Sequence, residues 1–252
     1  MGGERSPERD IPPSALRPPP SALRMTLTLP DGRTVRPGKI LCIGRNYAAH
    51  VREMGDVAEA PADPVVFLKP STALVADGGE VVLPRQSADV HHELELVAVI
   101  GTGGRHVAER DALGHVAAYA IGLDLTARDL QAEAKAARGP WSIAKGFDTF
   151  APLGPLVDAA LVGDPQAIRI ALAVNGEVRQ AGTTADMISS VARIVAFLSS
   201  VFTLEPGDLL YTGTPEGVGP VRDGDRLVAT WHTAAGAALP ALTVTARAEA
   251  PR

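Results

Sequence analysis

One long β-compatible run, residues 90–100, constrains the fold more than any other feature, because two carboxylates stand in it among apolar side chains. The run reads Val-His-His-Glu-Leu-Glu-Leu-Val-Ala-Val-Ile. Side chains alternate between the two faces of a strand, so Glu93 and Glu95 project from the same face as Val97 and Val99. If that face is buried, two neighbouring anions require a cation, a proton or a pair of bases. A hard divalent cation fits best, because only oxygen ligands are offered. The alternative is an edge strand whose polar end faces water.

A third carboxylate, Asp124, ends the otherwise apolar run Ala-Ile-Gly-Leu-Asp-Leu at residues 120–125. It stands immediately before a predicted helix. Three carboxylates, completed by water and substrate to six-fold coordination, form the kind of site that Mg²⁺ prefers. His91 lies on the same strand face as both glutamates, either as a partner that orients a ligand or as an ordinary strand-end histidine.

The rest of the chain consists of short β-compatible runs between turn signals, with few helices. Strands are predicted at 26–29, 39–43, 65–69, 81–83, 117–124, 208–212, 226–231 and 241–247. Asp31-Gly32 and Asn175-Gly176 are hairpin turns, the second between strands 168–174 and 177–181. Helices are predicted at 47–54, at 127–137 with Thr126 as its N-cap, and at 187–201. Because strands and helices do not alternate regularly, the pattern predicts an α+β fold.

The first 24 residues differ from the rest. Six of the first 20 residues are Pro, and Pro-Pro-Ser-Ala-Leu-Arg occurs at 12–17 and again at 19–24. Such a segment cannot bury enough apolar surface to offset the entropy lost on ordering, so residues 1–24 are predicted to be a disordered tail. Met25 opens the first strand and is an alternative translation start. A short β segment at 25–38 and a catalytic domain at 39–252 are expected to follow.

Composition excludes several partner classes. A formal net charge of −5, with scattered Arg residues, provides no basic surface for nucleic acid. No apolar stretch is long enough to span a membrane, so a cytoplasmic location is expected by default. The single cysteine, Cys42, lies in an apolar run; it can form no intrachain disulfide and is interpreted as a small buried hydrophobe. At 46% hydrophobic residues, the chain can form a sizeable core.

Three further segments carry candidate chemistry. His50 and Glu53 stand at helical i, i+3 spacing, which is either a surface pair or a carboxylate-oriented imidazole able to act as a general base. Lys145 lies in an apolar and aromatic loop, either solvated or positioned to bind a carboxylate or an oxyanion. The Gly- and Thr-rich residues 211–220 are typical of a ligand-lining loop, because glycines permit close backbone approach and Thr hydroxyls can bind a carboxylate.

Taken in order, these segments resemble the fumarylacetoacetate hydrolase family, and especially its small acylpyruvase and oxaloacetate decarboxylase members. The resemblance runs from about residue 40 to residue 248. It rests on Ile-Gly-Arg-Asn-Tyr (43–47) with His50 and Glu53, Phe-Leu-Lys-Pro (67–70), His-His-Glu-Leu-Glu-Leu (91–96), Gly-Leu-Asp (122–124) with Arg128 and Gln131, residues 141–155, Asn-Gly (175–176) and Thr-Gly-Thr-Pro (212–215).

The resemblance implies a mixed β-roll, usually a homodimer, that binds Mg²⁺ or Mn²⁺. The implied metal ligands are Glu93, Glu95 and Asp124. A small 2-oxo acid would chelate the metal, assisted by Lys145 and by the substrate-binding residues Arg45, Arg128, Gln131 and Thr214. The helix with His50 and Glu53 would close over the substrate as a lid, and His50, held by Glu53, would activate water.

Three functions follow as hypotheses. The first is hydrolysis of a C–C bond in an acylpyruvate such as fumarylpyruvate or acetylpyruvate. The second is decarboxylation of oxaloacetate, or decarboxylation or isomerisation of another 2-oxo diacid in aromatic-acid catabolism, which needs no attacking water. The third is a non-catalytic binding protein that keeps the fold.

Overall fold

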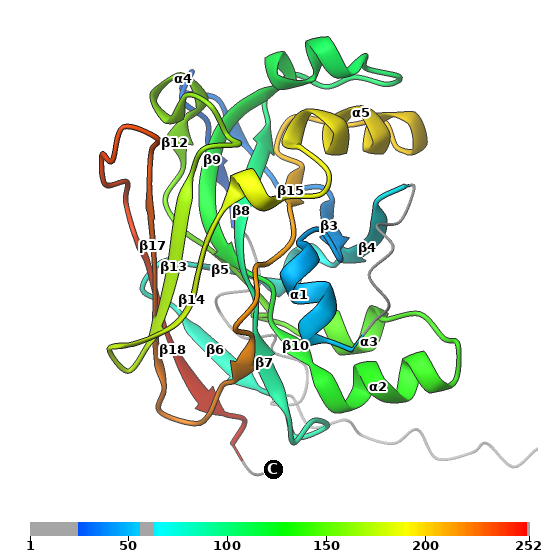
Figure 1. Cartoon of the computed structure of the whole chain (residues 1–252), viewed down its shortest axis with the longest axis vertical. Helices are drawn as coiled ribbons and strands as arrows, with labels where there is room; N and C mark the ends of the chain where they lie inside the picture. The colour runs from blue at the N-terminus through cyan, green and yellow to red at the C-terminus, as the bar shows by residue number, and fades with distance from the viewer. Residues whose placement is uncertain (1–24, 56–62, 251–252) are drawn as a thin grey trace, which may run out of the picture.

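The computed structural model describes residues 25–55 and 63–250, so the predicted tail at 1–24 lies outside the described residues. Within these ranges the chain forms four sheets and short helices (Figure 1). The largest sheet contains β3 (Ile40–Gly44), β4 (Val65–Lys69), β5 (Leu74–Ala76), β8 (Leu94–Ile100), β9 (Val116–Leu123), β11 (Ala151–Leu153), β12 (Val157–Asp158) and β15 (Leu209–Tyr211). Its main order is β4-β3-β15-β8-β9-β11-β5, with β12 paired to β9.

The second sheet has the order β14-β13-β17-β18-β6. Its strands are β6 (Glu80–Leu83), β13 (Arg169–Val174), β14 (Glu177–Thr183), β17 (Arg226–His232) and β18 (Leu242–Ala248). As predicted, Asn175-Gly176 joins β13 to β14; both residues have positive φ, 53° and 85°, as a tight hairpin turn requires. The smaller sheets are β1 (Leu27–Thr28) with β2 (Thr34–Val35), and β7 (Val90–His92) between β10 (Thr126–Ala127) and β16 (Gly219–Pro220).

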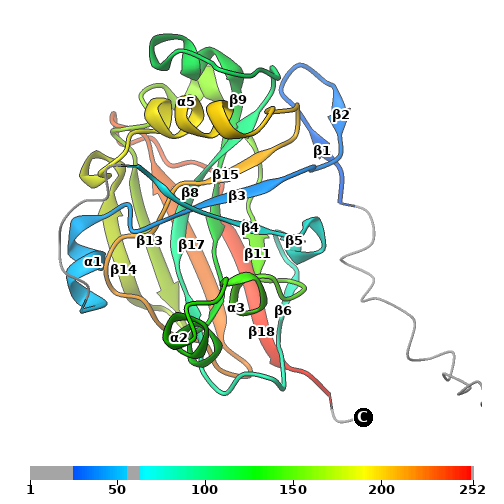
Figure 2. The same ribbon diagram turned by 90° about the vertical axis from the view of Figure 1, so that its right-hand side faces the viewer.

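Two apolar clusters cover opposite faces of β8. Leu94, Leu96, Ala98 and Ile100 join a core shared with the second sheet, which includes Trp231. Val97 and Val99 belong to the other cluster, with Ile40 and Tyr211. Figures 1 and 2 show the second sheet on one side of β8 and the helices α1, α2 and α3 on the other. The face of β8 that bears Glu95 is therefore buried, and the edge-strand alternative is excluded.

Nine of the ten strands predicted outside the 90–100 run are confirmed to within one residue at each end, and the tenth, 177–181, is two residues too short because β14 continues to Thr183. The continuous strand predicted over residues 90–100 is wrong. The chain leaves β7 in the three-stranded sheet and enters β8 in the large sheet, with Glu93 between them. The break is held by Gln180 of β14, whose Oε1 accepts hydrogen bonds from the Leu94 backbone N–H and from the His92 ring.

The described helices are α1 (Ala48–Glu53), α2 (Arg128–Ala136), α3 (Ser142–Lys145), α4 (Ala159–Val162) and α5 (Val191–Val201), with 3₁₀ helices η2 (Ser71–Ala73), η3 (Glu109–His115) and η4 (Thr184–Asp186). The predictions for α1 and α2 are confirmed to within one residue. The start of α5 was predicted too early, because Ser190 caps it through the Arg193 N–H. The Thr126 cap is also wrong, since its hydroxyl donates to Glu93 Oε1 instead.

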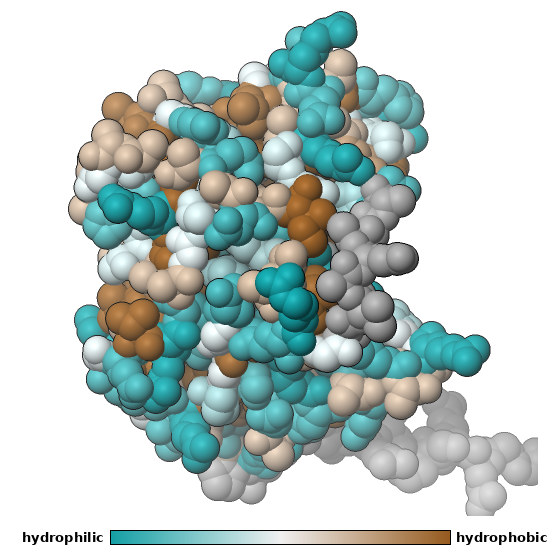
Figure 3. All heavy atoms as spheres, in the orientation of Figure 1, coloured by the Kyte–Doolittle hydropathy of each residue, from teal (hydrophilic) through white to brown (hydrophobic). Residues whose placement is uncertain are grey.

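The surface seen in Figure 3 is a mosaic of hydrophilic and hydrophobic side chains, as expected for a folded domain. Among the described residues, no helix combines the length and apolar character needed to cross a bilayer.

Candidate metal centre and catalytic site

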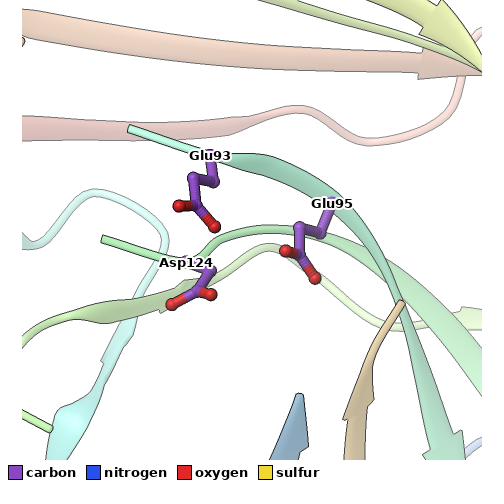
Figure 4. A group of neighbouring side chains, drawn as sticks. All are labelled: Glu93, Glu95 and Asp124. Atoms are coloured by element: carbon purple, nitrogen blue, oxygen red, sulfur yellow. The ribbon is translucent and has the colours of Figure 1, made fainter. Parts of the chain in front are cut away.

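Glu93, Glu95 and Asp124 meet at one end of the β8–β9 pair (Figure 4). Leu94 pairs with Leu123, and the Asp124 N–H donates to the Glu93 carbonyl oxygen at 2.8 Å, so the strand register itself places Asp124 opposite Glu93. One carboxylate oxygen from each residue lies within 4.8 Å of the others, and the three residues are 5%, 1% and 0% exposed. The structure therefore brings the three predicted ligands together in a buried position.

Two predicted side chains supply positive charge to this cluster. Lys145 Nζ lies 2.6 Å from Asp124 Oδ2 and 2.9 Å from Glu93 Oε2. Arg128 Nη2 lies 2.6 Å from Glu93 Oε1. Because Lys145 is 2% exposed, the structure excludes the solvated alternative for this lysine. The neighbouring carboxylates outweigh burial and raise its pKa, so Lys145 remains cationic.

A third cation, Lys69, was not predicted as a site residue. Its Nζ donates to the carbonyl oxygens of Leu125, Lys145 and Phe150, and lies 2.7 Å from Asp124 Oδ1 as an ion pair. Its side chain is fully buried. The available signal was a lysine at the end of the apolar run Val-Val-Phe-Leu at 65–68, since a lysine in such a strand is seldom buried without a partner.

Glu93 and Glu95 stand two residues apart in opposite electrostatic environments. Burial alone would raise the pKa of Glu93, but the Lys145 and Arg128 cations hold it well below its usual range. Burial raises the pKa of Glu95, the anions Asp124 and Glu93 raise it further, and the Gly213 N–H at 2.8 Å from Glu95 Oε2 only partly opposes them. Glu95 is therefore the carboxylate that most lacks a positive neighbour.

The residues present fit a hard divalent cation. All three side chains offer carboxylate oxygens, which are the ligands that Mg²⁺ and Mn²⁺ accept. Asp124 Oδ1 is buried and forms the ion pair with Lys69, but accepts no hydrogen bond from the described residues. The carboxylates carry a formal charge of −3, and Lys69, Lys145 and Arg128 carry +3. A divalent ion would therefore leave the site formally at +2, which an anionic ligand would offset.

His50 and Glu53 lie on α1, which packs over the same cavity. His50 Nδ1 lies 3.1 Å from Glu53 Oε2, and the other oxygen of Glu53 accepts the Gly217 N–H at 2.9 Å. His50 is 8% exposed whereas the side chain of Glu53 is 32% exposed, so the imidazole is buried and the pair is not the surface pair considered above. The Glu53 contact assigns the ring proton to Nδ1 and leaves Nε2 as the hydrogen-bond acceptor.

The four predicted substrate-binding residues line one cavity with these groups. Its wall contains Arg45, His50, Glu93, Glu95, Arg128, Gln131, Lys145 and Thr214, together with Phe67 and Trp141. Arg128 Nη1 donates to Gln131 Oε1 at 2.8 Å, which fixes both side chains. The predicted residues are thus gathered from distant parts of the chain into a single site.

Gln180 is a supporting residue that the sequence did not reveal. Besides its bonds at the β7–β8 break, its Nε2 donates to Thr214 Oγ1 and to the Pro215 carbonyl oxygen, both at about 3 Å. It therefore links the backbone next to Glu93 with the loop that carries Thr214. Gln180 stands in β14 between two residues that are exposed in the structure. No local pattern in the sequence therefore indicated that Gln180 itself is buried.

His91 does not contact the ligands. Its Nε2 lies 2.9 Å from Asp89 Oδ1, and burial lowers its pKa. It lines a second, outer cavity and not the one that contains the carboxylates. Of the two interpretations given for this histidine, the structure favours the ordinary strand-end residue.

The sequence and the fold are similar to those of known proteins. The family described as fumarylacetoacetate (FAA) hydrolase C-terminal matches residues 39–244. The chain is 47% identical over 191 residues to the mitochondrial oxaloacetate tautomerase FAHD1 of Arabidopsis thaliana, covering 76% of this chain and 85% of the relative. It is 45% identical over 194 residues to the oxaloacetate tautomerase YcgM of Escherichia coli, covering 77% and 88%.

A solved structure is also similar. Fumarylpyruvate hydrolase from Pseudomonas aeruginosa, in complex with Mn²⁺ and pyruvate, superimposes with a TM-score of 0.82 at 43% identity, covering 93% of this chain and 99% of that one. The predicted fold class, an α+β mixed β-roll, is confirmed.

Proposed function

Because the chain belongs to the fumarylacetoacetate hydrolase family, we propose that it is a divalent-metal-dependent enzyme that hydrolyses the C–C bond of an acylpyruvate. The observation that carries the proposal is the position of His50, which contacts Glu53, in the wall of the cavity that Glu93 and Glu95 also line, next to Asp124. The similarity to a fumarylpyruvate hydrolase supports the same reaction.

Glu93, Glu95 and Asp124 would hold the metal, and Mg²⁺ or Mn²⁺ bound there would act as a Lewis acid toward the 2-oxo acid. Around that position, Arg128 and Gln131 are fixed by their mutual hydrogen bond. Thr214 Oγ1 accepts from Gln180, which leaves its own proton free to bind a substrate oxygen. These residues would orient the pyruvate portion of the substrate.

His50 would act as the general base. Its Nε2 takes a proton from water while the water oxygen forms a bond to the acyl carbonyl carbon. The C–C bond then breaks, its electron pair passes to the pyruvate carbon as an enolate, and the proton held by His50 returns to that carbon. Lys145, already cationic, would stabilise the negative charge that develops on oxygen.

A second candidate function uses the same site without water. Two relatives, at 47% and 45% identity, are named oxaloacetate tautomerases, which favours turnover of oxaloacetate by tautomerisation or decarboxylation. Both reactions pass through enol or enolate forms that Lys145 would stabilise, and neither consumes water. Tautomerisation needs only a proton moved between carbon and oxygen.

Assays of the purified, Mn²⁺-loaded protein separate these functions. Fumarylpyruvate and acetylpyruvate are followed by release of pyruvate, and oxaloacetate by its enol absorbance and by CO₂ release. The proposal expects kcat/KM for an acylpyruvate to exceed that for either oxaloacetate reaction. Turnover of oxaloacetate alone would replace the first function by the second, and no turnover of any substrate would favour a non-catalytic binding protein.

A further inference from the structure

Helix α2 presents three polar side chains to the site in succession. Arg128, Gln131 and Lys135 are spaced at i, i+3 and i+7, which places them on one helix face, and all three line the cavity. A rise of ~1.5 Å per residue separates the first from the last by roughly 10 Å along the helix. Arg128 reaches Glu93, whereas Lys135 lies toward the outer end.

A second cavity lies beside the first along α2. The inner cavity, which contains the carboxylates, has a volume of about 40 Å³. A neighbouring cavity of about 490 Å³ shares Met54, Arg128, Gln131 and Lys135 with it. A ligand held at the carboxylates would therefore extend along α2 toward Lys135.

Lys135 differs from the other cations of α2 and of the inner site. Lys69, Lys145 and Arg128 each form an ion pair with a ligand carboxylate. Lys135 forms none with the carboxylates of residues 25–55 and 63–250, and its Nζ lies 5.7 Å from the centre of the Trp141 ring. This cation–π contact holds the ammonium group beside the cavity without neutralising its charge.

The acidic groups of the outer cavity already have partners. Asp129 accepts from Ser87 Oγ and the Ala88 N–H, and Asp89 contacts His91. Glu53 is held between His50 and the Gly217 N–H. Lys135 is therefore an exposed cation at the edge of both cavities, next to an aromatic wall of the inner cavity that is formed by Trp141 and by Phe67 at a centroid distance of 5.8 Å.

We infer that Lys135 determines specificity by binding a second carboxylate at the far end of the acyl group. The preferred substrates are thus carboxylate-terminated acylpyruvates, whose flat or extended acyl chain lies along the Phe67–Trp141 wall. This inference rests on the proposed function for the reaction, but its test measures binding and so separates the two.

The test compares two 2-oxo acids of equal chain length that lack a hydrolysable acylpyruvate bond. Calorimetry on the Mn²⁺-loaded protein measures the affinity for 2-oxoadipate, which has a distal carboxylate, and for 2-oxohexanoate, which does not. The wild type is expected to prefer 2-oxoadipate. Lys135→Met should weaken 2-oxoadipate binding by about tenfold, the loss of one charge-assisted contact, and leave 2-oxohexanoate binding unchanged.

Two controls make the result specific. Lys135→Arg keeps the charge and should keep the preference. Arg138→Met removes a nearby exposed cation that is outside both cavity linings, so it should change neither affinity.

The inference is overturned if the wild type shows no preference, if Lys135→Met weakens both ligands equally, or if Arg138→Met has the same effect as Lys135→Met. A preserved preference in a protein that hydrolyses no acylpyruvate would support the role of Lys135 and contradict only the proposed hydrolysis.

Discussion

The carboxylate cluster and helix α1 face the same cavity but are held in different ways. Glu95, Asp124, Lys69 and Lys145 are almost completely buried, and β8 and β9, which position the two carboxylates, are each paired on both sides. Helix α1 has six residues, is preceded by Tyr47 without a side-chain cap, and leaves the side chain of Glu53 32% exposed. In the proposed mechanism, substrate anchoring would therefore depend on the core of the fold, whereas water activation would depend on a short helix.

The largest expected effect comes from Glu95→Gln, which removes one of the three proposed metal ligands. Loss of a metal ligand should reduce acylpyruvate hydrolysis and oxaloacetate turnover alike by about a thousandfold or more, because metal catalysis contributes several kcal/mol to both. The fold should persist, since Glu95 forms no ion pair with a cation of residues 25–55 and 63–250 and burial favours its neutral form. Steady-state kinetics with Mn²⁺ and a thermal melt check both statements; full activity in this variant would remove Glu95 from the ligand set.

His50→Gln tests the proposed role of helix α1 in activating water. Acylpyruvate hydrolysis should fall by about a hundredfold or more, the usual contribution of a general base, while Mn²⁺ binding remains. Decarboxylation of oxaloacetate needs no attacking water and should change far less. The ratio of the two kcat values is the measurement. An equal loss in both reactions would show that His50 does not act through water.

Gln180→Met tests the hydrogen bonds that link the start of β8 to the loop that carries Thr214. The variant leaves the buried Leu94 N–H, the His92 ring and the Thr214 hydroxyl without a partner, which should lower the free energy of unfolding by about 1–3 kcal/mol. Val178→Met, on the same strand but 64% exposed, should change it by less than about 0.5 kcal/mol. Urea unfolding of both variants gives the comparison, and equal stabilities would show that Gln180 is dispensable.

The smallest effect is a pH dependence of metal affinity. The raised pKa of Glu95 favours its protonated form in the absence of metal, so metal binding should release a proton. Affinity should therefore increase with pH, by at most about tenfold per unit, until the pH exceeds the pKa of Glu95. Calorimetry in buffers of different ionisation enthalpy measures the released proton; Glu95→Gln should abolish that release, and release unchanged in the variant would point to another group.

Local patterns in the sequence predicted the three carboxylates of the site better than the distant residues that hold them in place. Period-2 alternation placed Glu95 on the face of Val97 and Val99, and the apolar context of Asp124 marked it as a buried carboxylate. The break at Glu93 could not be predicted, because it depends on Gln180, 86 residues beyond Leu94. The Thr126 cap failed for the same reason, since its hydroxyl bonds to Glu93, 33 residues away.

The His50–Glu53 pair was visible from helical spacing, but the burial of His50 was not. His50 is buried because α1 packs over the cavity, and Glu53 is held by the Gly217 N–H, 164 residues away. Lys69 was overlooked because three carbonyl oxygens from distant segments, and not its own strand, make its burial favourable.

Binding of Mn²⁺ and oxalate to the wild type, Glu95→Gln and His50→Gln tests the account most directly. Oxalate carries the two adjacent oxygens of a 2-oxo acid but cannot react. Calorimetry is predicted to show one Mn²⁺ per chain and Mn²⁺-dependent oxalate binding in the wild type and in His50→Gln, with both lost in Glu95→Gln. Absence of Mn²⁺ binding in the wild type, or oxalate binding that survives in Glu95→Gln, would contradict it.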